Sequence, residues 1–422
     1  DGTRYGITAG EGVRQIDFTD GVTLAVTDSG IVANNGDTLQ FVENHAGFID
    51  GVLTPDGRQF FYSYDDAGNL VAARNMATAQ SVRFGYDPTA AHRLVVSTGF
   101  GGAGGSFIDY AGTVTTSALD GDLGSAVDYT QSSRSGTLAA GQVDRYTFTL
   151  RDSELAATAG GSVYVGVIVE ADASGVLPAI PTIAGLTPVA SGVQGTRAFA
   201  VFKLDTAGLK LLQLAGRDPS QAGAYKLSLF IAGDADHDGD VDGSDAQLIA
   251  AAKGKQAGEA GYLASADADQ NGRIDASDMQ LLMQNLGFAP NRAPAIVAGQ
   301  VKTHLELEVN APVSDFVADP EGDTTYFRIV GSTHGTARLS GDGRSVEFMP
   351  EAGFVGRASF DIVADDGFGR STGTIYVDIS DAKLIALDIV NRSPHIGVGG
   401  GQQLYLVGDF EDQFNVDIPA SY

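Results

Sequence analysis

The sequence predicts a mainly β, multidomain chain in which β-sandwiches follow one another in tandem around one small α-helical module. Its 422 residues exceed the usual domain size of about 100 to 150 residues, so three or four separately packed cores are expected. The 56 glycines and turn signals such as Asn35-Gly36 separate short runs rich in Thr, Val and Ser, as in strands joined by tight turns. Two acidic loops near the middle, each followed by an apolar helical pattern, predict the helical module.

The first unit, residues 1–115, contains two Tyr-Asp pairs in similar surroundings. They are Tyr64-Asp65, which is followed by Gly and Leu, and Tyr86-Asp87. This pattern resembles the YD repeats of RHS and teneurin-like shells. The resemblance implies hairpin units whose Asp and Gly form the turn while alternating aromatic residues face the core. An unrelated β-meander is the alternative.

The second unit, residues 116–232, alternates apolar and polar residues at period two in the stretches 146–150 and 225–231. Its two ends also carry a recurring set of residues: Ser135, Gly136, Thr137, Leu138, Gly141, Asp144, Tyr146, Gly223, Ala224 and Tyr225. This set resembles the bacterial pre-peptidase C-terminal domain. The resemblance implies a β-sandwich that serves secreted proteins as an accessory or folding-support module and has no catalytic role.

The strongest pattern lies in residues 233–290 and consists of two twelve-residue loops with matching spacing. Each loop has oxygen-bearing side chains at positions 1, 3, 5, 9 and 12 and a glycine at position 6. In the first loop the side chains are those of Asp234, Asp236, Asp238, Asp242 and Asp245. In the second they are those of Asp267, Asp269, Asn271, Asp275 and Asp278.

This spacing suits calcium, a hard ion that takes six to eight oxygen ligands. We therefore predict Ca²⁺ as the cofactor of both loops. Position 7, which is Asp240 in the first loop and Arg273 in the second, would donate its backbone carbonyl. The aliphatic residues at position 8, Val241 and Ile274, would bury the inner face of each loop. Acidic surface turns without metal are the alternative.

Each loop precedes an apolar helical pattern, at residues 246–252 and 279–286, and no helix is expected before the first loop. This repeated loop-then-helix order, with Asp rather than Glu at position 12, resembles a dockerin. Dockerins of cellulosomal enzymes dock a cohesin through helix-face residues, and the corresponding positions here are Gly243, Ser244, Ala276 and Ser277. The basic residues common on that face are missing and the module lies in mid-chain. We therefore favour an intramolecular structural clamp over a cohesin-type partner.

The fourth unit, residues 291–380, opens with Arg-Ala-Pro and has acidic turn motifs at 318–323 and 364–367. Together with the motifs at 348–350 and 353–356, these resemble the cadherin-like domains of bacterial surface proteins. The resemblance implies an aligned β-sandwich. Its candidate calcium ligands, near a domain junction, are Asp319, Glu321, Asp323, Asp365 and Asp366. Acidic β-turns without metal are again the alternative.

The last unit, residues 381–422, has apolar runs at 384–389 and 403–406 that resemble the first strands of a bacterial Ig-like domain. A sandwich of this kind needs about twice as many residues, so we expect the domain to be truncated. The chain also begins at Asp1 without Met and without a signal peptide, which favours an internal fragment of a longer protein.

Composition excludes several classes of partner and chemistry. The net charge of -27 argues against nucleic acid, because affinity for phosphates requires Lys and Arg surfaces, and it also disfavours anionic lipid. No apolar run reaches the roughly 18 residues of a membrane span, so no membrane insertion is expected. Without Cys, the chain has no disulfide, no Cys-based zinc site and no thiol nucleophile.

No catalytic motif is found, since the six His form no H-E-x-x-H pair and neither a G-x-S-x-G elbow nor a Walker loop occurs. We therefore predict a non-enzymatic, calcium-stabilised structural or adhesive segment of a large bacterial cell-surface or secreted protein, located outside the cell. Its expected partners are neighbouring domains or copies of the same protein. The alternative is the ancillary tail of a secreted hydrolase, whose dockerin-like module would bind a cohesin-type partner.

Overall fold

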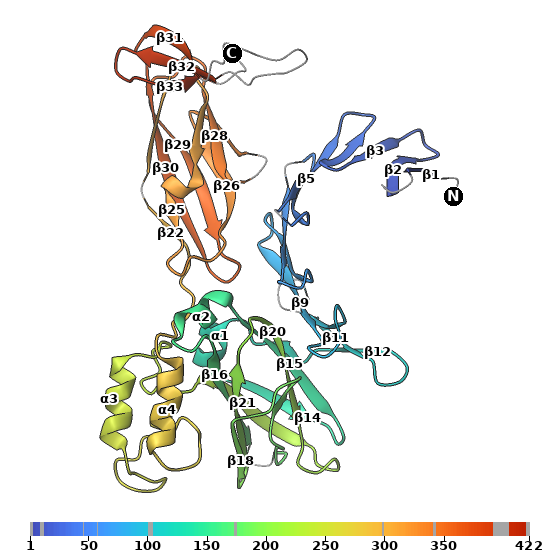
Figure 1. Cartoon of the computed structure of the whole chain (residues 1–422), viewed down its shortest axis with the longest axis vertical. Helices are drawn as coiled ribbons and strands as arrows, with labels where there is room; N and C mark the ends of the chain where they lie inside the picture. Colours follow the sequence, from blue (N-terminus) through green and yellow to red (C-terminus); the bar gives the residue numbers. More distant parts are fainter. Residues whose placement is uncertain are drawn as a thin grey trace. The chain divides into compact units, whose positions relative to one another are not determined.

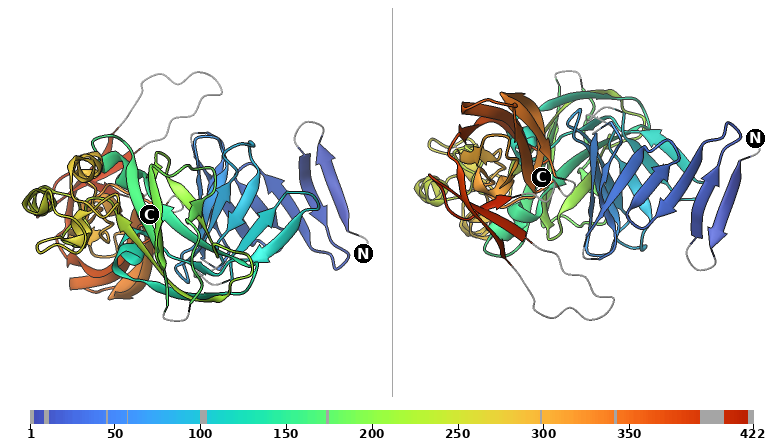
Figure 2. Two further views of the ribbon diagram at one scale, coloured as in Figure 1. Left: turned by 90° about the horizontal axis from the view of Figure 1, so that it is seen from below. Right: turned by 90° about the horizontal axis from the view of Figure 1, so that it is seen from above.

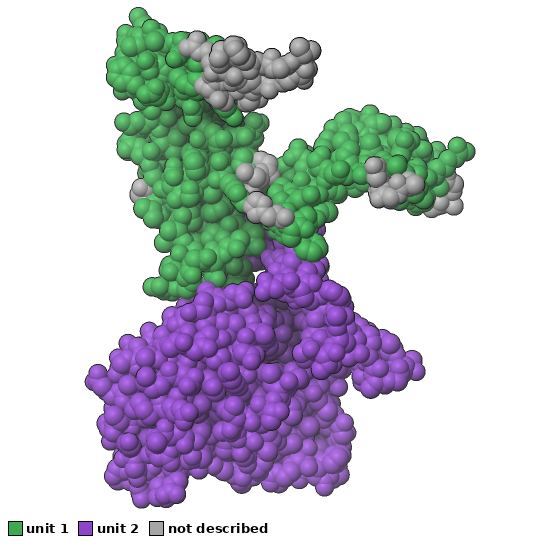
Figure 3. Space-filling model, viewed as in Figure 1, with its two compact units in different colours: residues 1–60, 292–422 green, residues 61–291 purple. Residues whose placement is uncertain are grey.

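The computed structural model is mainly β with several sheets in tandem and few helices, which confirms the predicted fold class (Figure 1). The structure describes residues 3–8, 12–44, 46–56, 58–99, 104–172, 175–297, 299–340, 343–390 and 405–418. The chain divides into two compact units, residues 61–291 and residues 1–60 with 292–422 (Figure 3).

The N-terminal part is an antiparallel meander in which each strand pairs with its neighbours in sequence. Within residues 1–60 the strands are β1 (Arg4–Thr8), β2 (Gly12–Asp17), β3 (Thr23–Thr27), β4 (Gly30–Ala33), β5 (Thr38–Glu43) and β6 (Ile49–Leu53). The same order continues through β7 (Gln59–Tyr64), β8 (Leu70–Asn75), β9 (Gln80–Tyr86), β10 (Leu94–Ser97), β11 (Ser106–Asp109) and β12 (Thr115–Ala118).

The two Tyr-Asp pairs lie where strands end and turns begin. β7 ends at Tyr64, and the Oδ1 atom of Asp65 accepts from the backbone N–H groups of the following turn. Asp87 follows β9 and accepts from Thr89 in the same way. The expected aromatic core is absent from the described part of this meander, whose buried apolar residues are Met76, Val82 and Val96. The reason is geometric, because an open meander leaves its aromatic side chains half-buried or exposed.

Residues 121–231 form two sheets that share one core. One sheet has the order β13 (Gly121–Asp122), β15 (Val143–Leu150), β20 (Gly208–Ala215), β17 (Thr182–Ile183). The other has the order β14 (Arg134–Leu138), β21 (Gly223–Ile231), β16 (Val163–Ala171), β19 (Arg197–Leu204), β18 (Ala190–Gln194). Alternating residues of both sheets, such as Phe148 and Phe202, are fully buried in the core. Two short helices, α1 (Ala126–Gln131) and α2 (Asp152–Ala157), complete the sandwich.

The helical module consists of α3 (Gly243–Ala252), the 3₁₀ turn η2 (Ala264–Ala266) and α4 (Ala276–Asn285), with α3 beside α4 (Figures 1 and 2). Both helices begin three residues before the predicted apolar patterns. Its apolar residues, among them Ile249, Leu282 and Phe288, belong to the same core as the sandwich. The module is therefore packed against the sandwich, within residues 61–291.

Residues 292–380 form a second β-sandwich. One sheet has the order β23 (Gln300–His304), β30 (Arg370–Ser380), β29 (Gly356–Asp365), β26 (Tyr326–Thr333), with β23 parallel to β30. The other has the order β24 (Val309–Pro312), β28 (Ser345–Pro350), β27 (Gly335–Leu339), and β22 (Ala295–Ile296) pairs with β25 (Val317–Ala318). A 3₁₀ turn, η3, spans Val313–Asp315. Phe316, Phe348 and Phe360 lie at the centre of its core.

The last described elements are β31 (Leu384–Val390), β32 (Tyr405–Phe410) and β33 (Val416–Ile418), which form one antiparallel sheet. β31 confirms the first expected strand. Residues 403 and 404 of the second expected strand lie outside the described residues. The buried ring of His304 stacks on Phe410 and its Nε2 atom lies 2.9 Å from Asp412 Oδ1, which joins this sheet to the sandwich. None of the helices that the structure describes is long and apolar enough to span a membrane.

Candidate metal centre

The two acidic loops are held at both ends by regular structure. The first loop leaves β21, which ends at Ile231, and leads into α3, whereas the second follows η2 and leads into α4. Asp242 and Asp275 are the N-cap residues of the two helices and accept from the backbone N–H groups of Ser244 and Ser277 at 2.6 and 2.8 Å. These caps explain why both helices begin earlier than predicted.

The carboxylate at position 12 of each loop accepts a hydrogen bond from the backbone N–H of position 9. The Oδ2 atom of Asp245 accepts from Asp242 N, and that of Asp278 accepts from Asp275 N, both at 2.8 Å. Each pair is a capping box in which the last loop acid lies in the first helical turn. Asp245 and Asp278 are fully buried, so their carboxylates are fixed from within the module.

The first loop gathers the carboxylates at positions 1, 3 and 12. Oxygen atoms of Asp234, Asp236 and Asp245 all lie within 4.8 Å of one another. Asp245 Oδ1 also accepts from the backbone N–H groups of Ala235 and Asp236 at 2.7 and 3.2 Å. The side chain of Asp234 is buried, with 6% exposed, and its Oδ1 atom has no hydrogen-bond partner. An acceptor of this kind fits a cation.

The second loop repeats the arrangement with Asp267, Asp269 and Asp278, whose oxygen atoms also lie within 4.8 Å of one another. The two oxygens of Asp267 accept from the backbone N–H groups of Asn271 and Gly272 at 3.1 and 2.8 Å. The hydroxyl of Tyr262 donates to Asp267 Oδ2 at 2.6 Å. The spacing in sequence therefore brings positions 1, 3 and 12 together in both loops.

The electrostatics show carboxylates that lack a counter-charge. Burial, and then the nearby Asp245, raise the pKa of Asp234 to about 7. Burial and the nearby Asp278 raise the pKa of Asp269 to about 6. Burial also raises the pKa values of Asp236, Asp240 and Asp278. A bound cation would relieve this repulsion, which is the electrostatic pattern expected of a metal site.

Positions 5 and 9 have a different local role. Asp238 and Asn271 each accept from the backbone N–H of position 7, at 3.1 and 2.8 Å. Hydrogen bonds from Ser277 lower the pKa of Asp275, in keeping with its N-cap role. These side chains stabilise the conformation of the loops. Each also has oxygen lone pairs that these hydrogen bonds do not use.

Position 7 differs from the expectation in the first loop. The sequence predicted only a backbone carbonyl there, yet an oxygen of the Asp240 side chain lies within 4.8 Å of oxygens of Asp242 and Asp245. Its Oδ1 atom is buried and has no hydrogen-bond partner. Arg273 occupies this position in the second loop, so only the first loop has an acid there. The acidic residue type at position 7 was the feature of the sequence that could have predicted a role for this side chain.

The two loops are linked by backbone pairing that has the same pattern in each half. Val241, at position 8 of the first loop, bonds with Gly287 and Phe288 after α4, at 2.9 and 3.0 Å. Ile274, at position 8 of the second, bonds with Gly254 and Lys255 after α3, at 2.7 and 2.9 Å. Both aliphatic side chains are fully buried, as predicted. Each loop is thus supported by the segment that follows the other helix.

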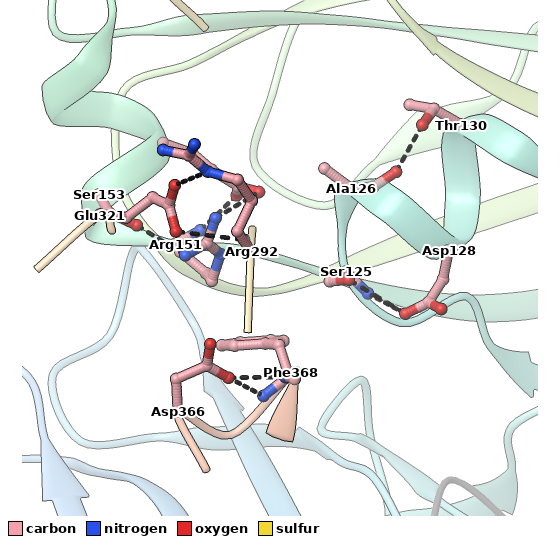
Figure 4. A network of polar contacts seen from close by, with 12 residues as sticks. Ser125, Ala126, Asp128, Thr130, Arg151, Ser153, Arg292, Glu321, Asp366 and Phe368 are labelled. Atoms are coloured by element: carbon pink, nitrogen blue, oxygen red, sulfur yellow. Dashed lines mark hydrogen bonds and ion pairs between the residues drawn. The ribbon is translucent and has the colours of Figure 1, made fainter. Parts of the chain in front are cut away.

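The candidate ligands of the second sandwich are not gathered in this way. Across the described ranges, none of these five residues belongs to a group of three acidic side chains whose oxygens lie within 4.8 Å. Glu321 binds Arg292, and Asp366 Oδ1 accepts from the backbone of Phe368 (Figure 4). Asp319 accepts from two N–H groups of its own turn, at 3.0 and 2.9 Å. These contacts are typical of acidic turns.

Two family models match parts of the chain. A dockerin type I domain matches residues 232–287, which contain both acidic loops. A bacterial Ig domain matches residues 291–378, where the sequence suggested a cadherin-like sandwich. Neither model is of a catalytic domain, and neither covers half of the chain. No curated protein matches the sequence significantly.

Among solved structures, the pre-peptidase C-terminal domain of a collagenase from Bacillus anthracis is 19% identical. The match covers 26% of this chain and 92% of that domain, with a TM-score of 0.18. An endo-fucoidan hydrolase of glycoside hydrolase family 107 is 11% identical over 82% of this chain, with a TM-score of 0.19, and this chain spans 42% of it.

A protocadherin gamma B7 fragment is 9% identical, with a TM-score of 0.20, over 84% of this chain and 75% of that one.

Proposed function

We propose that this chain is a non-catalytic, calcium-stabilised segment of a modular secreted or cell-surface protein of bacteria. The domain limits 1–115, 116–232, 233–290, 291–380 and 381–422, including YD-like repeats in the first, are part of this proposal. In it, the helical module binds two calcium ions and fixes the chain between the neighbouring β-domains. The match to dockerin type I and bacterial Ig domains supports the modular, non-catalytic character.

The observation that carries the proposal is the clustering of positions 1, 3 and 12 in both loops, together with the unpartnered Oδ1 atom of buried Asp234. The proposed ligands of the first site are Asp234, Asp236, Asp238, Asp240, Asp242 and Asp245. Those of the second site are Asp267, Asp269, Asn271, Arg273, Asp275 and Asp278, with Arg273 acting through its carbonyl. Oxygen donors alone, without His or Cys, favour calcium over zinc.

Bound calcium would supply the positive charge that these carboxylates lack. The chain itself supplies the rest of the site: Asp245 and Asp278 are fixed by the capping boxes, and the position-8 residues anchor each loop to the opposite half. At a free calcium concentration 100 times the dissociation constant, one site would add about 2.7 kcal/mol to the free energy of unfolding. Because the module shares its core with the sandwich, this stabilisation would extend to their joint.

Calcium titration by calorimetry, with thermal melts in calcium and in EDTA, tests this proposal on the whole chain. We expect two binding events and a transition that melts lower in EDTA. The double variant Asp234→Ala/Asp267→Ala should lose both binding events and the calcium-dependent shift. Absence of binding to the unaltered chain, with identical melts, would contradict the proposal.

A second candidate function is docking of a cohesin-type partner, as in the ancillary tail of a secreted hydrolase. It is favoured by one observation: the residues at the helix starts that the dockerin resemblance assigns to docking are all exposed in this structure. They are Gly243, Ser244, Ala276 and Ser277. Surface plasmon resonance with purified cohesin domains, in calcium and in EDTA, tests it. Calcium-dependent binding that is lost in Ser244→Arg would favour docking. Absence of binding would contradict docking and favour the intramolecular clamp.

A further inference from the structure

The two loops differ sharply at position 4. The residue at this position is not a proposed ligand in either site. His237 in the first loop and Gln270 in the second share a left-handed backbone, with φ of 62° and 59°. The side chain of His237 is exposed, whereas Gln270 is buried, with 9% exposed. The same backbone turn is therefore open to solvent in one loop and covered in the other.

The cover over Gln270 is the hairpin of β18 and β19 in the adjoining sandwich. Gln194, the last residue of β18, donates from Nε2 to the carbonyl oxygen of Gln270 at 3.1 Å. Arg197, the first residue of β19, donates from Nη2 to Gln270 Oε1. Gln270 Nε2 in turn donates to the carbonyl of Asp267 at 2.5 Å. A chain of hydrogen bonds thus runs from the hairpin to the first residue of the second loop.

Position 4 lies between residues that face the proposed ion, since Asp269 precedes Gln270 and Asn271 follows it. Fixing its carbonyl and side chain fixes the backbone from which these neighbours project. Partners of this kind, which orient ligands without touching the metal, are worth about 10- to 100-fold in metal affinity. His237 has no side-chain hydrogen bond in the described part of the chain, so position 4 of the first loop has no comparable support.

We propose that the adjoining sandwich completes the second calcium site, with Gln270 as the positioning residue that couples this site, and not the first, to the β18–β19 hairpin. This inference rests on the calcium sites of the proposed function. Coupling between binding and structure is reciprocal. Calcium in the second loop therefore stabilises the hairpin, and loss of the hairpin contacts weakens calcium binding in that loop alone.

Variants that retain only one of the two calcium sites allow each loop to be tested by itself. Asp234→Asn leaves the second loop for titration, and Asp267→Asn leaves the first. In the second-loop background, Gln270→Ala should weaken calcium binding by about 10-fold or more. His237→Ala in the first-loop background is the matched control, since it imposes the same strain at a left-handed residue, and it should leave calcium affinity unchanged within about twofold. Equal effects of the two Ala variants would overturn the inference.

A milder variant and a second readout cover the case in which Gln270→Ala misfolds. Gln194→Ala removes one hydrogen bond from an exposed side chain and should still weaken the second site several-fold. Terbium(III) can report on this site directly, because Tyr262 is bonded to Asp267 and should sensitise its luminescence. Tyr262→Phe should abolish that signal. Luminescence titrations of Gln194→Ala that match the unaltered chain would contradict the inference.

Amide hydrogen exchange tests the reciprocal effect. Calcium should slow exchange in residues 190–204 of the unaltered chain and of Asp234→Asn, but not of Asp267→Asn. If calcium binds yet leaves exchange in the hairpin unchanged, the inference fails while the proposed function stands. If calcium does not bind the unaltered chain at all, the proposed function itself fails.

Discussion

Asn285, the last residue of α4, and Tyr164, in the adjoining β16 strand, exchange two hydrogen bonds across the joint between the helical module and the sandwich. Tyr164 N donates to Asn285 Oδ1 at 2.7 Å, and Asn285 Nδ2 donates to Tyr164 O at 2.9 Å. The same Nδ2 also donates to Ala232 O at 2.8 Å. The fully buried Asn285 amide therefore continues the backbone pairing of the sheet and fixes α4 to it.

Replacement of Asn285 by Ala should loosen this joint. The change leaves buried backbone groups without a partner, so the free energy of unfolding should fall by about 2–4 kcal/mol. Denaturant unfolding with calcium present measures this loss. Gln280→Ala, at an exposed position of the same helix, is the control and should stay within about 0.5 kcal/mol of the unaltered chain. Equal midpoints for the two variants would show that Asn285 does not hold the joint.

Gly233 should tolerate no side chain. It has φ of 101°, and a Cβ atom there would lie 2.6 Å from Leu282 Cα, where the residue before the first loop passes against α4. Gly233→Ala should therefore destabilise the protein by about 2–4 kcal/mol through backbone strain and overpacking. Gly243→Ala is the matched control, because a Cβ atom at Gly243 would meet no atom within 4 Å. Thermal melts of both variants in calcium measure the difference, and similar melting temperatures would contradict the close approach.

The sequence predicted the loops well because metal-binding geometry is local. Ligand spacing and the glycine bend are set within twelve residues, so positions 1, 3 and 12 could be paired before any fold was known. The helix starts were missed because Asp242 and Asp275 were considered only as ligands, although Asp before an apolar run is also an N-cap signal. The side chain of Asp240 was missed because position 7 was assigned a backbone role.

Contacts between distant segments could not be predicted in the same way. Nothing near Asn285 in the sequence points to Tyr164, and Gln270 gives no sign of its bond to Arg197. In the first sandwich, by contrast, resemblance did select interacting residues. Tyr225 donates to Asp144 at 2.5 Å, and its hydroxyl oxygen lies 2.8 Å from that of Tyr146. All three residues belong to the set that carries the resemblance to the pre-peptidase C-terminal domain.

The two loops should respond differently to salt. The first has six carboxylates, whereas the second has an amide at Asn271 and a cation at Arg273. Attraction of the first loop for calcium is thus more electrostatic, and screening should weaken it more strongly. Calorimetry on Asp267→Asn and Asp234→Asn, at about 0.05 M and about 0.5 M KCl, should show a several-fold greater loss of affinity in the first loop.

Exchanging the charges at position 7 tests the cause of this difference. In Asp240→Arg/Arg273→Asp, the salt dependence of the first loop should become shallower and that of the second steeper. The total charge of the chain is unchanged by this swap. If net charge alone set the salt dependence of calcium affinity, each loop would therefore keep its original dependence. If the salt dependence of calcium affinity in each loop is the same before and after the swap, position 7 does not cause the difference.

The calcium-free protein should lose stability as the pH rises, opposite to the usual behaviour of paired carboxylates. Asp234 and Asp269 have pKa values raised to about 7 and about 6, against 3.8 for an ordinary Asp. Between about pH 4 and pH 7 the folded state therefore binds more protons than the unfolded state, and stability falls through this window. Melts of calcium-stripped protein across it should show a falling melting temperature, with a shallower fall in Asp234→Asn.

Calcium should reverse this dependence. Protons and calcium compete for the same carboxylates, so calcium affinity should rise as Asp234 and Asp269 lose their protons. Melting temperatures in excess calcium should therefore rise, or stay level, over the range in which the calcium-free protein is destabilised. The diverging curves would separate the loop carboxylates from the general repulsion of a chain with net charge -27, because that repulsion lowers stability in both conditions. Parallel curves with and without calcium would instead place the destabilisation elsewhere in the chain.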